Sequence, residues 1–272
     1  MHNPLFLQMK RSPNWVALAS ALGCFLSWAD GMAVHVSTIS QRPSSVIVVS
    51  HPPIERVRPP AWTAWLPPFL SDDQMDVRIQ WETSTCDAVR RERTEAAAAS
   101  MVQQANRWKQ HCRRSGVGCF DTTNGGIGDD DVFLEELGQS FRTFEDFCRR
   151  YLDPARTCRA RLVASRGRQS TKCPQWHTDY VPVRWIQALV GPGCVWAEYA
   201  NGSPEASARQ AATGTAVLLP GRYWNDYFLH STCNEATVVS ASAVRHKSPE
   251  LSFPWQGRIL LTIDVDLGAT DD

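Results

Sequence analysis

Several common signatures are missing from the sequence. Lys plus Arg equals Asp plus Glu at 28 each, so no net charge points to nucleic acid or to an anionic membrane surface. No Gly-x-Ser-x-Gly elbow and no Gly-x-x-x-x-Gly-Lys phosphate loop occurs, which argues against a serine hydrolase and against nucleotide hydrolysis. The nine cysteines include no Cys-x-x-Cys pair, so a disulfide framework is not expected. We therefore expect reduced, mostly buried thiols and no nucleic-acid partner.

Long hydrophobic runs are also scarce. The apolar stretch from Trp15 to Ala29 is shorter than the roughly 20 residues that span a bilayer, so no stable membrane insertion is expected. Lys10 and Arg11 before it, and the small residues near its end, are typical of a signal or organelle-targeting segment at residues 1–29. The alternatives are a hydrophobic helix packed on the domain or a true start at Met32, and without a signal the protein would be cytoplasmic.

The next two segments differ in composition. Residues 31–84 hold seven of the 17 prolines between Pro43 and Pro68, which favours an extended region, with one short β-branched strand at residues 45–50. Residues 85–155 are expected to be helical. Good helix formers fill residues 85–114. A second helix is indicated by apolar residues that recur every three or four positions, namely Phe133, Leu137, Phe141, Phe144, Cys148 and Tyr151.

The last segment, residues 156–267, has the pattern of antiparallel strands. Short β-branched or alternating runs are separated by Gly and Pro turns. The length and strand spacing suit a double-stranded β-helix, also called a jelly roll or cupin-like fold. With residues 1–30 as the targeting segment, we expect an α+β protein whose N-terminal helices pack on this C-terminal domain. The expected strands are 161–165, 181–190, 215–219, 236–244 and 258–265.

A candidate metal site begins at His177 and Asp179, which form the sequence's only His-x-Asp. On a strand, residues i and i+2 face the same side, so an imidazole and a carboxylate at this spacing can share one ion. His246 follows the expected strand 236–244, and a jelly roll brings the ends of distant strands together. It would complete the His, Asp, His facial triad of non-haem Fe(II) oxygenases. Arg258, twelve residues later, can pair bidentately with a carboxylate.

The order and spacing of these four residues resemble the pattern of 2-oxoglutarate and Fe(II)-dependent oxygenases. The resemblance implies that His177, Asp179 and His246 bind Fe(II), and that Arg258 binds 2-oxoglutarate. It also implies a small-molecule or protein substrate. Candidates for the substrate pocket are Trp176, Tyr180, Arg184 and Trp196.

A second interpretation starts from Cys173, four residues before His177. A thiolate suits zinc and adds nothing to an iron oxygenase, so Cys173, with His177 and either Asp179 or His246, would mark a non-redox zinc-binding protein. The simplest alternatives are structural. In these, His177 hydrogen-bonds near Asp179, His246 caps a strand and Arg258 forms an ion pair, in a jelly roll that acts only by interaction.

Six short motifs resemble the family called domain of unknown function 1826, over about residues 140–266. They are Cys173-Pro-x-Trp-His-x-Asp, Val181-x-x-Arg184, Gly191-Pro-Gly-x-x-Trp196, Leu218-Leu-x-Gly221, His246-Lys-Ser-Pro249 and Arg258-Ile-Leu-Leu-Thr-Ile-Asp264. Some members are encoded near zinc-handling proteins, so the resemblance implies a metal site and leaves the metal open. This chain departs from the family pattern at Trp176, Tyr180, Cys194, Pro220 and Lys247, so the residues expected around the ligands differ from those of the family.

Overall fold

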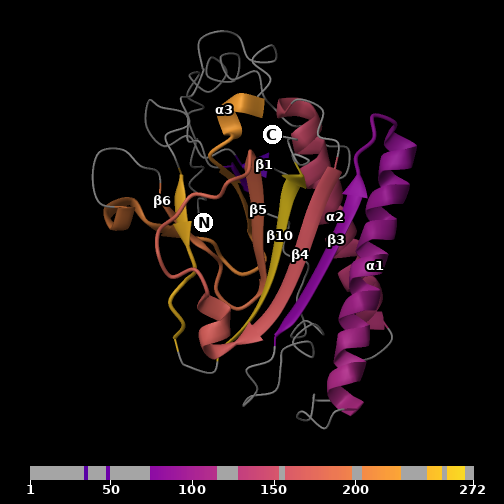
Figure 1. Ribbon diagram of the computed structural model, residues 1–272, viewed down its shortest axis with the longest axis horizontal. Coiled ribbons are helices and arrows are strands. Elements are labelled where there is room, and N and C mark those ends of the chain that lie inside the picture. The colour runs from indigo at the N-terminus through magenta and orange to yellow at the C-terminus, as the bar shows by residue number, and fades with distance from the viewer. Residues whose placement is uncertain are drawn as a thin grey trace, which may run out of the picture.

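The computed structural model describes residues 34–35, 47–49, 74–114, 128–152, 157–197, 204–227, 244–252 and 256–266. These residues form two antiparallel sheets and a pair of long helices (Figure 1). The mixture of helices and antiparallel strands confirms the expected α+β class. In chain order the elements are β1 (Val34–His35), β2 (Ile47–Val49), β3 (Met75–Glu82), α1 (Asp87–Arg114), α2 (Gly128–Tyr151), β4 (Thr157–Arg166), the 3-10 helix η3 (Gly167–Thr171), β5 (Val183–Val190), β6 (Val195–Ala197), the 3-10 helix η4 (Pro204–Ser207), β7 (Arg209–Gln210), β8 (Ala216–Pro220), α3 (Trp224–Tyr227), β9 (Arg245–Lys247) and β10 (Gly257–Asp266).

The larger sheet has the strand order β1-β2-β8-β5-β10-β4-β3, and every pairing in it is antiparallel. Strand β10 lies between β4, which it pairs along its whole length, and β5. The smaller sheet has the order β7-β6-β9. The last strand of the chain is therefore internal to the larger sheet.

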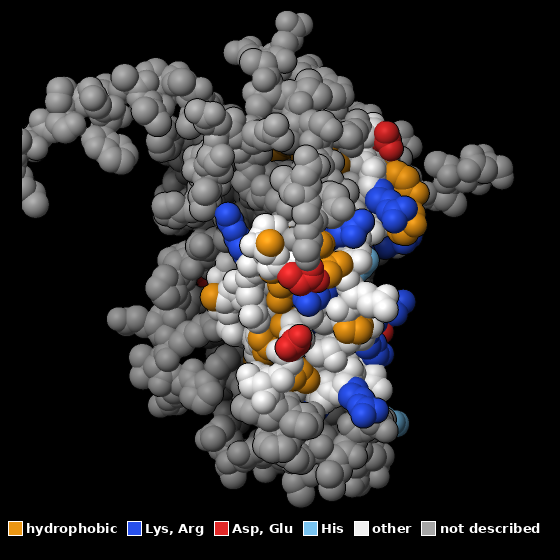
Figure 2. Space-filling model, turned by 90° about the vertical axis from the view of Figure 1, so that its left-hand side faces the viewer, with side chains coloured by type: hydrophobic (Ala, Val, Ile, Leu, Met, Phe, Trp, Pro, Cys, Tyr) orange, Lys and Arg blue, Asp and Glu red, His pale blue; other side chains and the backbone are white. Residues whose placement is uncertain are grey.

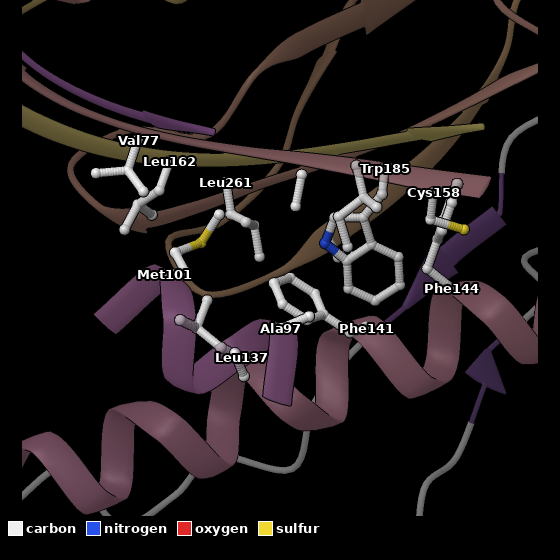
Figure 3. Packing of buried hydrophobic residues seen from close by; sticks show 14 of the residues in the cluster. Val77, Ala97, Met101, Leu137, Phe141, Phe144, Cys158, Leu162, Trp185 and Leu261 are labelled. Atoms are coloured by element: carbon white, nitrogen blue, oxygen red, sulfur yellow. The ribbon is translucent and has the colours of Figure 1, made fainter. Parts of the chain in front are cut away.

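Helices α1 and α2 cover one face of the larger sheet (Figure 1). Figure 3 shows Phe141, Phe144 and Leu137 of α2 pointing toward Trp185 and Leu261 of the strands. The rings of Phe141 and Trp81 stack at 4.7 Å between centroids. Five residues of the apolar stripe expected from the sequence, from Phe133 to Cys148, are fully or nearly fully buried, and Tyr151 is partly buried. The stripe is thus the contact between helix and sheet.

The opposite face of the same sheet carries a second core and a cavity. Because side chains alternate along a strand, Ile259, Leu261 and Ile263 of β10 join the helix-side core, whereas Arg258 and Asp264 line the cavity. Next to this cavity lies a smaller hydrophobic cluster that includes side chains of β5, β6 and β8: Ile186, Cys194, Trp196, Ala211, Val217, Leu219 and Val244.

Several local expectations need correction or lie outside the described residues. Strand β3 forms in the region expected to be extended and proline-rich, and it pairs with β4 over all eight of its residues. His246 lies within β9 rather than after a strand. The expected strand 236–244, apart from Val244, and the proposed targeting segment 1–29 lie outside the described residues. Among the described helices, none is long and apolar enough to cross a membrane.

Candidate metal centre

The structure brings His177, Asp179 and His246 together. One ligand atom from each lies within 4.8 Å of the others. The two histidines are bridge partners: His177 N donates to His246 O at 3.0 Å, and His246 N donates to His177 O at 2.8 Å. Their rings lie 4.3 Å apart between centroids. Backbone pairing between the 177 segment and β9 therefore joins two residues that are far apart in sequence.

Asp179 reaches the cluster without belonging to a strand, contrary to the expected strand geometry. Its backbone is held by the turn after β8, where Arg222 N donates to Asp179 O at 2.9 Å and Gly221 N donates to Pro182 O at 2.9 Å. A Cβ atom on Gly221 would lie 1.9 Å from the Val181 carbonyl oxygen. The absence of a side chain at position 221 lets the turn approach the Asp179 segment.

The ring of His177 is oriented by its own backbone neighbour. Its Nδ1 atom lies 2.9 Å from the Gln175 carbonyl oxygen, and a carbonyl only accepts, so Nδ1 carries the proton. This leaves Nε2 with a free lone pair, 3.7 Å from Asp179 Oδ1. A backbone carbonyl on the distal nitrogen is the usual support of a metal-ligating histidine.

Asp179 Oδ2 and His246 Nε2 lie 3.2 Å apart. Burial, followed by the charges of His177 and Arg184, lowers the pKa of His246 to about 3, so the contact is not an ion pair at neutral pH. Asp179 Oδ2 is buried and has no hydrogen-bond partner among the described residues. A buried carboxylate oxygen without a hydrogen-bond partner, next to a neutral imidazole nitrogen, fits a bound cation.

The other oxygen of Asp179 is held by Arg184 of β5. Arg184 Nη1 lies 2.7 Å from Asp179 Oδ1, and the same guanidinium binds Asp264 of β10 through Nε at 2.6 Å and Nη2 at 2.7 Å. Burial alone would lower the pKa of Arg184, but the two carboxylates raise it. Burial raises the pKa of Asp264, and Arg184 opposes this change. Arg184, expected only as a pocket residue, thus positions a candidate ligand.

Arg258 lies in the same cavity, which has a volume of about 590 Å³. Its side chain is buried, with Nε donating to Pro192 O at 3.0 Å and Nη1 donating to Ser170 O at 3.3 Å. No carboxylate pairs with it among the described residues. Burial lowers the pKa of Arg258 to about 10, opposed by Cys194 and Cys173, so the guanidinium is still a cation at neutral pH.

The Gly191-Pro192-Gly193 turn explains how Arg258 is held. Gly191 has a φ of 78°, and a Cβ there would lie 2.5 Å from the Gly257 carbonyl oxygen. Only glycine adopts this conformation readily at such a close approach. The turn therefore packs directly on the start of β10 and presents the Pro192 carbonyl to Arg258.

The remaining expected residues fall in different places. Cys173 lines the cavity but is not part of the His-Asp-His cluster. Trp176, Tyr180 and Trp196 are not among the described residues that line the cavity. Trp176 donates to Glu205 at 2.7 Å, Tyr180 is 63% exposed beneath Arg222, and Trp196 is buried in the smaller hydrophobic cluster.

Two histidines and a carboxylate beside a buried arginine define a candidate mononuclear metal centre. Residues 152–264, which contain this centre, match a family model described as "Protein of unknown function (DUF1826)". The match confirms the resemblance seen in the sequence motifs. No curated protein matches the chain.

Solved structures with a distant likeness include two dioxygenases for auxin oxidation and a Neurospora crassa protein. The rice dioxygenase is 16% identical, with 81% of this chain and 73% of that chain covered and a TM-score of 0.35. The Arabidopsis thaliana dioxygenase for auxin oxidation, solved with 2-oxoglutarate, is 12% identical, with 79% of this chain and 75% of that chain covered and a TM-score of 0.33. The full-length Neurospora crassa protein in complex with alpha-KG is 12% identical, with 82% of this chain and 74% of that chain covered and a TM-score of 0.35. These TM-scores are too low to support an argument about chemistry, so the case for function rests on the site itself.

Proposed function

We propose that the protein is a non-haem Fe(II), 2-oxoglutarate-dependent oxygenase, and that its two antiparallel sheets form a jelly roll. One observation carries the proposal. Arg258, a buried cation without a carboxylate partner among the described residues, lines the same cavity as His177 and His246 of the His-Asp-His cluster. A cation site and an anion site in one cavity suit a metal ion and an acidic cosubstrate.

His177, Asp179 and His246 would hold the iron. Two imidazoles and one carboxylate are the donor set of the facial triad, which leaves coordination positions open. Bound Fe(II) would supply oxygen activation. Arg184 keeps the Asp179 carboxylate oriented, and the Gln175 carbonyl keeps Nε2 of His177 available for the metal.

Arg258 would bind the distal carboxylate of 2-oxoglutarate. An isolated buried charge is costly, and an anionic ligand would offset this cost. The carbonyl groups of Pro192 and Ser170 fix the plane of the guanidinium before the ligand arrives. A fixed guanidinium in a site shielded from water binds a carboxylate more strongly than an exposed one.

The second candidate is a non-redox zinc-binding protein linked to metal homeostasis, with Cys173 as an additional ligand. The observation in its favour is that Cys173 lines the same cavity. Against it, Cys173 lies outside the cluster of atoms within 4.8 Å of one another. Thus the three ligands of the oxygenase already lie together, whereas the zinc site would also have to draw Cys173 in.

The test is to add Fe(II) and 2-oxoglutarate to the purified protein without oxygen and then to admit air. The oxygenase predicts a visible metal-to-ligand charge-transfer band, followed by release of succinate. Asp179→Ala should lose both signals, whereas the matched change Cys173→Ser should keep both. Tightly bound zinc that is lost in Cys173→Ser, together with no succinate from the unaltered protein, would support the zinc protein and overturn the oxygenase.

A further inference from the structure

Three arginines line the cavity on β3 and β4, at one edge of the larger sheet. Arg78 lies on β3, and Arg159 and Arg161 lie on β4. Their side chains are 69%, 59% and 43% exposed, so they can still bind a ligand. They line the same cavity as His177 and Arg258. We call these three residues the arginine group. Figure 2 shows the side of the molecule opposite α1 and β3, where other parts of the described surface carry Lys and Arg side chains along one edge.

Strand register connects the arginine group to the metal cluster. Arg159 is paired with Asp264 of β10, which is paired with Arg184 of β5, and Arg184 contacts Asp179. Neighbouring strands are about 4.8 Å apart, so Arg159 and Arg184 are separated by roughly 10 Å across the sheet. A small organic molecule can therefore contact the arginine group and the metal cluster at the same time.

Within the arginine group, Arg78 and Arg161 have one carboxylate partner between them among the described residues. Asp76 binds two guanidiniums, with contacts of 2.8 Å to Arg161 and of 3.0 and 3.2 Å to Arg78. Arg159 pairs with Asp266. Arg159 also lies opposite Asp264, which Arg184 binds, so the unbalanced charge lies at Arg78 and Arg161. Moreover, Arg78 and Arg161 are direct cross-strand partners, an arrangement that like charges destabilise. A further anion would relieve this repulsion.

The wall of the cavity between the arginine group and the metal cluster is partly apolar. Thr262 lies next to Arg161 in the register, Ile186 lies next to Thr262, and Leu260 also lines the cavity. Side chains of this kind contact a hydrocarbon chain favourably and offer it no charge. Arg258 is paired with Ser165 of β4, whereas Asp264 is paired with Arg159. Arg258 and Asp264 are six residues apart along β10, a distance of roughly 20 Å. The anion site at Arg258 is therefore separate from the arginine group.

We propose that the substrate is an organic anion whose carboxylate or phosphate is bound by Arg78, Arg159 and Arg161. Its apolar body crosses Ile186 and Leu260 toward the His-Asp-His cluster. The reaction of such a substrate rests on the proposed oxygenase function, but its binding does not. The substrate class is therefore an acid with an extended apolar body.

The probes are octanoate, octyl phosphate and the neutral octanamide, titrated calorimetrically into the full chain with Fe(II) and saturating 2-oxoglutarate in the absence of oxygen. Saturating 2-oxoglutarate keeps Arg258 occupied. We expect at least one anion to bind about tenfold or more tightly than octanamide, since charge-assisted hydrogen bonds are among the stronger ones. The tighter of the two anions identifies the group that is recognised. The difference should shrink with added salt, because the arginine group is partly exposed.

Arg159→Gln/Arg161→Gln should abolish the preference for the anion while keeping the charge-transfer band of iron and 2-oxoglutarate. The matched control is Arg91→Gln/Arg107→Gln, which removes the same charge from exposed positions on α1 and should keep the preference. Should the cavity variant fold poorly, Asp76→Asn gives an independent test. Removal of this competing carboxylate should tighten binding of the anion several-fold.

Equal binding of all three probes, or an unchanged preference in a folded Arg159→Gln/Arg161→Gln variant, would overturn the inference. The two proposals fail in different ways. Selective anion binding that is lost in Arg159→Gln/Arg161→Gln, without a charge-transfer band in the unaltered protein, supports the arginine group and counts against the oxygenase. A charge-transfer band without selective anion binding supports the oxygenase and overturns the substrate class.

Discussion

His177 and His246 exchange both backbone hydrogen bonds across an antiparallel bridge, at 3.0 and 2.8 Å. On its other side, His246 is paired with Trp196 of β6. The distance between the two imidazoles is thus set by main-chain pairing and not by side-chain contacts alone. A site built in this way holds its ligands close together before any metal binds, which lowers the cost of ordering them.

Replacement of Arg258 by Gln should weaken the binding of 2-oxoglutarate by about 100-fold, because charge-assisted bonds to a carboxylate are lost. The dissociation constant can be measured from the charge-transfer band as 2-oxoglutarate is added. Iron content should stay the same, since Arg258 is not in the cluster. The control is Arg168→Gln, an exposed arginine of η3. Equal affinity in the Arg258 variant would assign this residue a structural role.

Arg184→Gln should reduce the affinity for Fe(II) about tenfold or more, as expected when a group that orients a ligand is removed. The cause is the loss of the 2.7 Å contact to Asp179. Competition with a chelator of known affinity measures the effect. Arg184→Lys should recover part of it, because one charge returns without the bidentate geometry. Identical metal affinity in all three proteins would contradict a positioning role.

Two Gly→Ala changes should have contrasting effects on stability. At Gly221 the new Cβ would meet the Val181 carbonyl oxygen at 1.9 Å, so Gly221→Ala should lower the free energy of unfolding by several kcal/mol. At Gly138, inside α2, the nearest atom is the flexible end of Arg142 at 3.2 Å. Since Ala favours helix over Gly, Gly138→Ala should be neutral or stabilise by up to about 1 kcal/mol. Thermal melting of both variants measures the contrast, and equal shifts would contradict it.

Asp76 should make stability depend on pH between about 4 and 2. Hydrogen bonds from Arg161, opposed by burial and aided by Arg78, lower the pKa of Asp76 from 3.8 to about 2. A carboxyl whose pKa falls on folding stabilises the protein above its unfolded pKa, and this contribution is lost as the pH falls through the folded pKa. Asp76→Asn should cost about 1 kcal/mol at neutral pH, after allowance for solvent screening. The difference from the unaltered protein should vanish near pH 2 in urea unfolding; a constant difference would contradict the assignment.

The sequence predicted much of the fold because local patterns carried the information. The stripe from Phe133 to Cys148 marked α2, and the β-branched runs marked β4, β5, β8 and β10. The three candidate ligands were found by type and order along the chain. Strand β3 was missed although Met75, Val77, Ile79 and Trp81 alternate, because the proline-rich stretch before it suggested an extended region with only one short strand, at residues 45–50.

Contacts that depend on strand register were not predictable. Arg184 and Asp264 are 80 residues apart, and only the pairing of β5 with β10 makes them neighbours. Proximity in sequence to the His-x-Asp motif suggested Trp176 and Tyr180 as pocket residues. Neither lines the cavity: Trp176 donates to Glu205, and Tyr180 lies under Arg222 where the chain belongs to no strand after the bridge at His177. No sequence pattern indicates this end of the strand pairing.

The alternation along β10 ties the chemistry of the cavity to the packing of the core. Ile259, Leu261 and Ile263 are held by the helices, while Arg258 and Asp264 reach into the cavity from the same strand. A slip of one residue would move isoleucines into the cavity and charged groups beneath the helices, at a high cost in free energy. The hydrophobic core therefore selects the register of β10, since only the register that buries Ile259 and Ile263 also places Arg258 in the cavity.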